Sequence, residues 1–474
     1  MLLSLSPIIL LVVLLFSAVQ LFGADASYGP NQVALLIASA AAGLVGMYRG
    51  LTWAEVQDSM VAGIRVGLGP ILILLAVGGL IGSWMVAGTV PAMIYYGVSI
   101  LNPSIFFAAA AIICALASIS IGSSWTVAGT LGIGLIGIAD SYGLSPAMAA
   151  GAIISGAYFG DKLSPLSDTT NLAAACTNVD LFAHIRHMLW TTVPAFCLAL
   201  IFFFMIDSGA ATAPEQIAEL RSAISAEFNV GVGVLIPLVV MLGLIWWRVP
   251  AYPAIMLATL AGVLTAVTLQ TAVVEKFALN ANPDATVPLI EGLWRTLFAG
   301  FEGTTSNEEL NRLISKGGIA SMLNTVWLIL SALAFGGVLE RTGILKQILD
   351  AVLKAVKSTG DLVLATVTGG FVTNILAADQ FLGIALPGRL FSSTYDEFRL
   401  SRENLSRTLE DSATMTSALI PWNTCGAYMA ATLGVATFEY APYAIFNIAC
   451  PLIAIAFGYL MFQQKPAEAA TSSA

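Results

Sequence analysis

The chain has 474 residues, of which 58% are hydrophobic and only 10% are charged, and its mean hydropathy is +0.88. A soluble globular protein carries about 25% charged residues, and a larger core does not explain the deficit because a soluble surface must still be wetted. Most of the chain is therefore predicted to be solvated by lipid. The net charge of −9 includes no basic stripe, which argues against a nucleic-acid partner.

A membrane-spanning helix needs about 20 predominantly apolar residues. In chain order, the clear candidates are Leu2–Phe22, Gln32–Tyr48, Pro70–Val90, Leu181–Ile206, Val230–Trp247, Tyr252–Leu269, Ile319–Leu339 and Tyr440–Phe462. Two further apolar regions, Ile105–Cys176 and Leu362–Val435, are interrupted by polar residues. The segment Gln270–Gly318 is predicted to be a mixed-charge loop, and residues 464–474 are predicted to be a disordered tail.

The two halves of the chain repeat each other weakly, at an offset of 255 or 256 residues. The matches are Gly82 with Gly337, Gly88 with Gly343, Ser123–Trp125 with Asp379–Phe381, and Pro165 with Pro421. We therefore predict an all-α polytopic membrane protein with two inverted repeats, residues 1–207 and 229–463, joined by an outer linker, residues 208–228. Each repeat is expected to hold five crossings and a re-entrant hairpin (Ile105–Ile138 and Leu362–Leu390), with broken helices at mid-membrane, as in many secondary transporters.

The distribution of Lys and Arg predicts the orientation. The outer loops of this topology, residues 23–29, 91–103 and 141–145, contain no Lys or Arg, whereas the inner loops carry many. Because positively charged loops stay on the cytoplasmic side, we expect a multi-pass protein of the inner (plasma) membrane with both termini in the cytoplasm.

The densest polar cluster is the run Gly160–Asn171, which lies between apolar segments. Pro165 interrupts a helix there, and such a break frees backbone carbonyls for a cation beside two carboxylates, Asp161 and Asp168. Intramembrane carboxylates usually face a cavity or a partner. A polar surface loop is the alternative, and it is disfavoured because the other half has a similar break. Ser164 and Thr169 are further candidate ligands in this run.

The counterpart in the second half begins at Glu410 and reaches Pro421 and Asn423. At the offset of 256 residues, neither Asp161 nor Asp168 meets a carboxylate, so the two breaks differ in charge. This asymmetry suits the coupling of unlike ions. The candidate ligands here are Asp411, Asn423 and Thr424.

The predicted hairpins supply further polar groups. Asp379 is a lone carboxylate in an apolar hairpin, aligned with Ser123 of the first half. A membrane serine often bonds only its own backbone, but a carboxylate in this position is a functional candidate. Ser123, Asn374 and Asp379 therefore join the candidate ion- or substrate-binding residues.

These motifs resemble those of the NhaC family of Na⁺/H⁺ antiporters, within a wider ion-transporter superfamily, and the resemblance covers most of the chain. It rests on Gly160–Asn171, Ala378–Gln380, Leu386–Arg389 and Pro421–Gly426. The resemblance implies Na⁺/H⁺ exchange, with Asp161, Asp168 and Asp379 as the carboxylates that bind the metal ion. The same family includes exchangers of malate and lactate, so the resemblance leaves the substrate open.

We therefore expect a secondary active transporter that exchanges Na⁺ for H⁺ by alternating access. Its expected partners are these two ions and the lipid bilayer, with no cofactor, and a homodimer is left open. The alternative is a Na⁺- or H⁺-coupled carrier of a small organic anion or amino acid, whose carboxylate Lys162 and Asn423 would bind. A passive channel is less favoured because paired broken helices are typical of carriers. An enzyme is least favoured, since the sequence has no metal-type histidine cluster.

Overall fold

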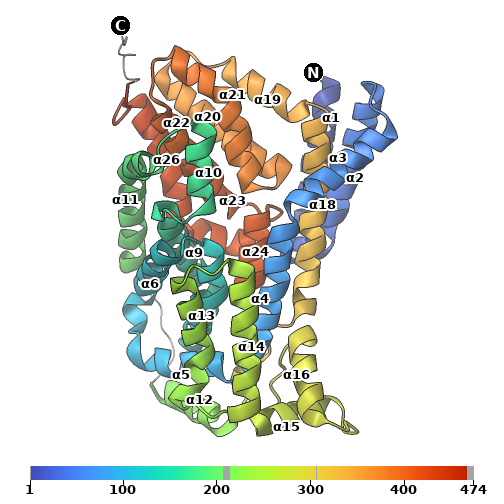
Figure 1. Cartoon of the computed structure of the whole chain (residues 1–474), viewed down its shortest axis with the longest axis vertical. Helices are drawn as coiled ribbons and strands as arrows, with labels where there is room; N and C mark the ends of the chain where they lie inside the picture. The colour runs from blue at the N-terminus through green and yellow to red at the C-terminus, as the bar shows by residue number, and fades with distance from the viewer. Residues whose placement is uncertain (1, 207–213, 306, 467–474) are drawn as a thin grey trace.

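The computed structural model describes residues 2–206, 214–305 and 307–466. Over these residues the fold is all-helical, apart from two isolated β-bridges, Phe301–Lys316 and Leu400–Pro466 (Figure 1). Eight of the described helices are long and apolar enough to cross a membrane, and the number rises to ten if each of two bent helix pairs forms one span. The prediction of an all-α, multi-pass membrane protein is confirmed.

The described residues of the first half form eleven α-helices. They are α1 (Leu2–Phe22), α2 (Pro30–Tyr48), α3 (Trp53–Val66), α4 (Leu68–Val86), α5 (Thr89–Ile100), α6 (Phe106–Ile121), α7 (Ser124–Val127), α8 (Ile133–Ser141), α9 (Pro146–Leu163), α10 (Asp168–Thr177) and α11 (Leu181–Met205). A π-helical turn, Ala128–Gly132, joins α7 to α8.

The described part of the second half begins with α12 (Pro214–Glu227), while residues 208–213 of the predicted linker lie outside the described residues. The helices that follow are α13 (Ile236–Trp246), α14 (Ala251–Leu269), α15 (Thr271–Ala281), α16 (Pro288–Ala299), α17 (Glu308–Ile314), α18 (Leu323–Arg341), α19 (Ile344–Leu353), α20 (Thr359–Ala377), α21 (Gln380–Glu397), α22 (Arg402–Leu409), α23 (Met415–Ser417), α24 (Thr424–Leu433), α25 (Thr437–Tyr440) and α26 (Ile445–Tyr459). A second π-helical turn, Glu410–Thr414, joins α22 to α23.

The prediction of a mixed-charge loop over Gln270–Gly318 is wrong, because α15, α16 and α17 occupy this segment. The charged side chains Glu291 and Arg295 lie on a partly exposed face of α16. A neighbouring face packs on α15, where a Cβ added at Gly292 would lie 2.6 Å from the Val274 carbonyl oxygen. Mixed charge therefore marks the solvated side of amphipathic helices here.

The two interrupted apolar regions each begin with a helix that turns sharply into another. After α6, Gly122 adopts a left-handed conformation (φ +73°), and the Ser123 hydroxyl then accepts a hydrogen bond from the Thr126 amide to cap α7. After α20, Ala378 adopts the same conformation (φ +57°), and the Asp379 carboxylate caps α21. Polar caps of this kind satisfy the free amides at a helix start, so both breaks lie where the sequence places polar residues.

A second pair of breaks follows, and each contains one of the two prolines singled out in the sequence. The chain leaves α9 at Leu163 and starts α10 after the capping residue Ser167. It leaves α23 at Ser417 and starts α24 after the capping residue Asn423. The predicted helix interruptions around Pro165 and Pro421 are therefore present.

Close packing against α6 fixes the position of α9. A Cβ added at Gly156 would lie 2.0 Å from the Ala111 carbonyl oxygen, and one added at Gly160 would lie 2.3 Å from the Ala115 carbonyl oxygen. Small residues spaced four apart let helices approach this closely in a membrane. The residue after Gly160 is Asp161, so this contact also positions a candidate ligand.

We expect Gly160→Ala to destabilise the protein by about 1–3 kcal/mol or more, because the added methyl group would overlap the backbone of α6. Gly243→Ala is the matched control, since a Cβ at Gly243 would meet no atom within 4 Å. Thermal unfolding of the detergent-solubilised proteins measures the effect. Equal melting temperatures for the two variants would contradict the packing argument.

The two ends of the described chain lie at the same end of the molecule. Helix α1 begins, and α26 ends, at the upper end of the molecule in Figure 1, whereas α12 and α15 lie at the opposite end.

Candidate functional site

A cavity of about 210 Å³ lies where three helix breaks meet. The turn from α6 to α7 supplies Gly122 and Ser123, the break between α9 and α10 supplies Asp168, and the start of α21 supplies Gln380. The remaining lining residues are Gly69, Pro70, Ile73, Trp125, Asp161, Ser167, Thr169, Ala251 and Phe381. Segments far apart in the sequence therefore build one polar cavity inside an apolar helix bundle.

Asp161 lies in the last turn of α9 and is 8% exposed. Both the backbone amide and the hydroxyl of Ser124 donate hydrogen bonds to its Oδ2 atom, at 3.0 Å and 2.7 Å. The Ser167 hydroxyl, at the start of α10, also lies within hydrogen-bonding reach of this carboxylate. Ser124 therefore orients a carboxylate that lines the cavity.

Asp168 is the first residue of α10, and its exposed side chain lines the same cavity as Asp161. The Thr169 hydroxyl lies 3.1 Å from the Ser167 hydroxyl, which caps the helix. No Lys or Arg side chain in the described structure forms an ion pair with either aspartate. Two carboxylates with neighbouring hydroxyl groups form an oxygen-rich site, which is the ligand set that hard cations prefer.

Ser164 does not line this cavity but shapes the break beside it. Its buried hydroxyl accepts a hydrogen bond of 3.3 Å from the Leu166 amide. A Cβ added at Gly122 would lie 3.0 Å from the Ser164 Oγ atom, so the turn after α6 presses directly on the break between α9 and α10.

Four other predicted residues gather around the two breaks of the second half, α20–α21 and α23–α24. The Asn423 amide donates to the backbone and side-chain oxygens of Asn374, and the Thr424 amide donates to the Ala378 carbonyl oxygen at 2.9 Å. Asp379 is fully buried, with Oδ1 bound to the Leu382 amide and Oδ2 lacking a hydrogen-bond partner among the described residues. Asn374, Asp379, Asn423 and Thr424 therefore form a group of their own, which contributes no residue to the lining of the 210 Å³ cavity.

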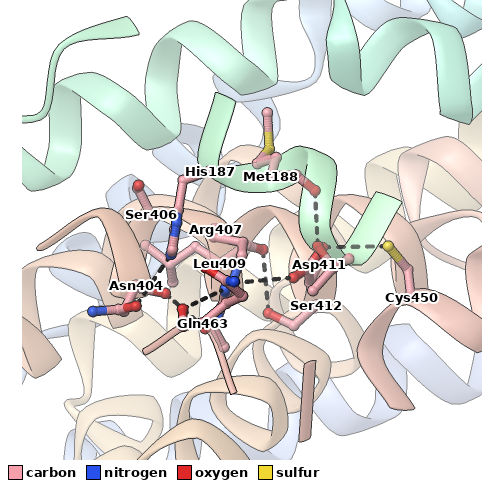
Figure 2. Close-up of polar contacts among 12 residues, drawn as sticks. His187, Met188, Asn404, Ser406, Arg407, Leu409, Asp411, Ser412, Cys450 and Gln463 are labelled. Atoms are coloured by element: carbon pink, nitrogen blue, oxygen red, sulfur yellow. Dashed lines mark hydrogen bonds and ion pairs between the residues drawn. The ribbon is translucent and has the colours of Figure 1, made fainter. Parts of the chain in front are cut away.

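Asp411 lies in a third place, inside a buried charge network (Figure 2). It forms an ion pair with Lys162, and both side chains are fully buried. The Thr191 hydroxyl and the Cys450 thiol donate to the same carboxylate, and the Arg407 Nε atom lies 4.0 Å from its Oδ2 atom. Neither Asp411 nor Lys162 lines the cavity, so Lys162 is committed to Asp411 in this conformation.

Sequence reasoning missed Glu410 and Arg248. Glu410 is fully buried in the π-helical turn beside Asp411. Its signal in the sequence is the spacing of Arg407, Glu410 and Asp411, which places three ionisable side chains on one helix face. Arg248 lines a second cavity, of about 350 Å³, which shares Gly122, Ser123, Asp168 and Ala251 with the first. No local pattern distinguishes Arg248 from other loop arginines.

Apolar helices, broken in pairs around a carboxylate site, define a multi-pass membrane protein built to handle a small charged solute. Residues 156–462 match the model of the Na⁺/H⁺ antiporter family. The chain belongs to this family, as the resemblance of its motifs implied, and it is a transporter rather than an enzyme by its family.

Several curated relatives cover nearly the whole chain. The Na⁺/H⁺ antiporter NhaC of Alkalihalophilus pseudofirmus is 39% identical, over 91% of this chain and 89% of the relative. The malate-2H⁺/Na⁺-lactate antiporter of Bacillus subtilis is 37% identical over the same shares. The arginine/ornithine antiporter ArcD of Halobacterium salinarum is 35% identical, over 99% of this chain and 95% of the relative.

Proposed function

We propose that this protein exchanges Na⁺ for H⁺ across the membrane by alternating access. The observation that carries the proposal is the pairing of Asp161 and Asp168 in one cavity without a cationic side chain of the described structure bound to either. Two uncompensated carboxylates attract a monovalent cation and repel an anion. The family match and the Na⁺/H⁺ antiporter NhaC of Alkalihalophilus pseudofirmus support the same ions.

Two inverted repeats, residues 1–207 and 229–463, are the proposed basis of alternating access. The helix-capping residues support this division, because Ser123 and Asp379, like Ser167 and Asn423, stand 256 positions apart. In Figure 1, α9 leads up to α10, whereas α22 leads down through α23 to α24. The turns α6–α7 and α20–α21 are the proposed re-entrant tips. Irregular backbone at membrane depth is tolerated where it lines such a cavity.

The proposed location is the inner (plasma) membrane, with both ends of the chain in the cytoplasm. The start of α1 and the end of α26 share one end of the molecule, which fits an even number of crossings. The Lys and Arg residues of the predicted inner loops support a cytoplasmic position for that end.

A coupled carrier of an organic anion is the second candidate function. Arg248 favours it, because this side chain lines the 350 Å³ cavity next to Asp168. An arginine in that position could bind the carboxylate of an organic substrate, while Asp161 and Asp168 hold a coupling cation. The relatives named as malate–lactate and arginine/ornithine antiporters support this second candidate function.

Flux in purified proteoliposomes separates the two functions. We expect Na⁺ added outside acid-loaded liposomes to drive proton efflux without any organic substrate, since the two carboxylates suffice to bind Na⁺. Activity should fall when the pH is lowered, because protons then compete with Na⁺ for carboxylates. A pH-sensitive dye inside the liposomes measures the efflux. Proton movement that appears only after malate, lactate or an amino acid is supplied would establish the organic-anion function instead.

A further inference from the structure

A cavity of about 330 Å³ lies away from the proposed transport site, where α1, α2 and α19 meet. Two basic side chains line it, Arg49 directly after α2 and Lys354 directly after α19. Its other lining residues are Leu5, Ile344, Gln347, Ile348 and Ala351. None of the described residues that line this cavity is an aspartate or a glutamate. The cavity therefore combines positive charge with an apolar wall.

Membrane-spanning segments end at this cavity. The candidate span in α1 begins at Leu5, and the spans of α2 and α18 end at Tyr48 and Arg341. Leu5 and Arg49 line the cavity, and Arg49 Nη1 donates to the carbonyl oxygen of Thr342, the residue after Arg341. The Tyr48 ring is 81% exposed, and exposed aromatic rings gather at the membrane–water interface. The cavity therefore lies at the level of the lipid headgroups.

Helix α19 runs along this end of the bundle and does not cross the membrane. Gly343 adopts a left-handed conformation (φ +71°) where the chain turns from α18 into α19. The helix has ten residues, too few for a span, and Ile344, Leu345 and Leu349 are buried whereas Lys346 is exposed. Amphipathic helices of this kind lie in the plane of the membrane surface. In Figure 1, α19 lies at the upper end of the molecule, where α1 begins.

The two basic side chains are held differently. Arg49 also donates from Nη2 to the Gln347 side-chain oxygen at 3.4 Å, so its guanidinium is positioned between the end of α18 and α19. Lys354 is exposed and forms no ion pair in the described structure, and neither does Asp350 one turn before it. A positioned guanidinium and an ammonium on a flexible stem together suit a phosphate group.

We propose that this cavity binds an anionic phospholipid, which goes beyond the proposed transport function and does not depend on it. The lipid phosphate interacts with Arg49 and Lys354, and the glycerol and acyl chain contact the apolar wall that includes Leu5 and Ile348. Basic pockets between spanning helices on the cytoplasmic side bind anionic headgroups, and this end of the molecule is the proposed cytoplasmic end. Free phosphate shares the charge but has no apolar part to place against the wall, so the lipid is the favoured ligand.

The bound lipid connects the two halves of the chain. Leu5 and Arg49 come from the first half, whereas Ile348 and Lys354 come from the second. A ligand that binds the folded protein and not the unfolded chain stabilises the folded state. An anionic phospholipid therefore raises the melting temperature of this protein more than a phospholipid without net charge does.

Thermal unfolding of the detergent-solubilised protein, with phosphatidylglycerol or phosphatidylcholine added, tests the proposal. We expect phosphatidylglycerol to raise the melting temperature of the wild-type protein above its value in phosphatidylcholine. Arg49→Ala and Lys354→Ala should each require about fivefold more phosphatidylglycerol for half of this shift, since one basic residue contributes about that factor. The double variant should lose the shift.

A second pair of lysines on the same segment provides the matched control. Lys346 and Lys357 are exposed and do not line the cavity, so the variant Lys346→Ala/Lys357→Ala should keep the shift. Arg49→Ala also removes contacts within the protein, so the quantity compared is the difference between the two lipids in the same variant. Lys354→Ala repeats the test at an exposed position that makes no such contact in the described structure.

Three results would overturn the proposal. Equal melting temperatures of the wild-type protein in the two lipids would show that no anionic lipid is preferred. An equal loss of the shift in Lys346→Ala/Lys357→Ala would show a general attraction to the basic surface and no defined site. A shift of the same size with inorganic phosphate alone would show that the cavity binds a free anion and not a lipid.

Discussion

Asp161→Asn and Asp168→Asn are each expected to abolish Na⁺-driven proton efflux while leaving the protein folded. Each change removes one of the two carboxylates that line the 210 Å³ cavity. A charge-assisted interaction contributes about 1.5–3 kcal/mol, and about 1.4 kcal/mol is a factor of ten in affinity, so Na⁺ affinity should fall more than about tenfold. An asparagine in place of Asp161 can still accept the two hydrogen bonds from Ser124, so the break keeps its shape.

The measurement is proton efflux from acid-loaded proteoliposomes across a range of Na⁺ concentrations. Asp58→Asn is the matched control, because Asp58 is an exposed aspartate on α3, away from the cavity, and this variant should transport normally. Wild-type flux in both Asp161→Asn and Asp168→Asn would remove this cavity as the cation site.

The second large effect is expected on stability. Asp411→Asn should cost about 3–5 kcal/mol, because it leaves Lys162, which is fully buried, without its partner. It also removes the only carboxylate within ion-pair distance of Arg407 in the described structure. Adding Lys162→Met to Asp411→Asn should recover part of the lost stability, since one of the two stranded charges is then gone.

Thermal unfolding and the yield of monodisperse protein measure this effect. Asp396→Asn is the matched control, because Asp396 pairs with Arg402 on the surface, and exposed pairs contribute only about 0–1 kcal/mol. If Asp411→Asn unfolds at the same temperature as Asp396→Asn, the buried pair does not hold the two halves of the bundle together.

The local features of the site follow from the sequence, because they depend on neighbouring residues. Pro165 and Pro421 interrupt helices because each lacks an amide donor. Ser123 caps α7, Asp379 caps α21 and Asn423 caps α24. The spanning helices can likewise be predicted from the apolar segments, because the length and hydropathy of a segment suffice to predict a membrane helix. The segment Gln270–Gly318 was wrongly predicted to be a loop, because α15 to α17 carry their charges on solvated faces.

The candidate ligands were harder to group from the sequence. Asp161, Asp168 and Asp411 all occur in polar runs beside helix breaks, and the sequence offers no means to rank them. The structure separates them, placing the first two in the cavity and the third against Lys162 and Arg407. Figure 2 shows Asp411 beside Arg407. The pairing of Lys162 with Asp411 joins residues 249 positions apart, a distance over which no periodic pattern carries information.

The sequence by itself therefore determined the class of protein and its helix breaks, because composition, proline and helix capping act locally. The tertiary structure alone decided which of the candidate residues share a cavity, that Lys162 is bound to Asp411, and that Glu410 is buried. Whether a buried side chain has a partner depends on which side chains the neighbouring helices place beside it. For Lys162 that partner is Asp411, which lies in the other half of the chain.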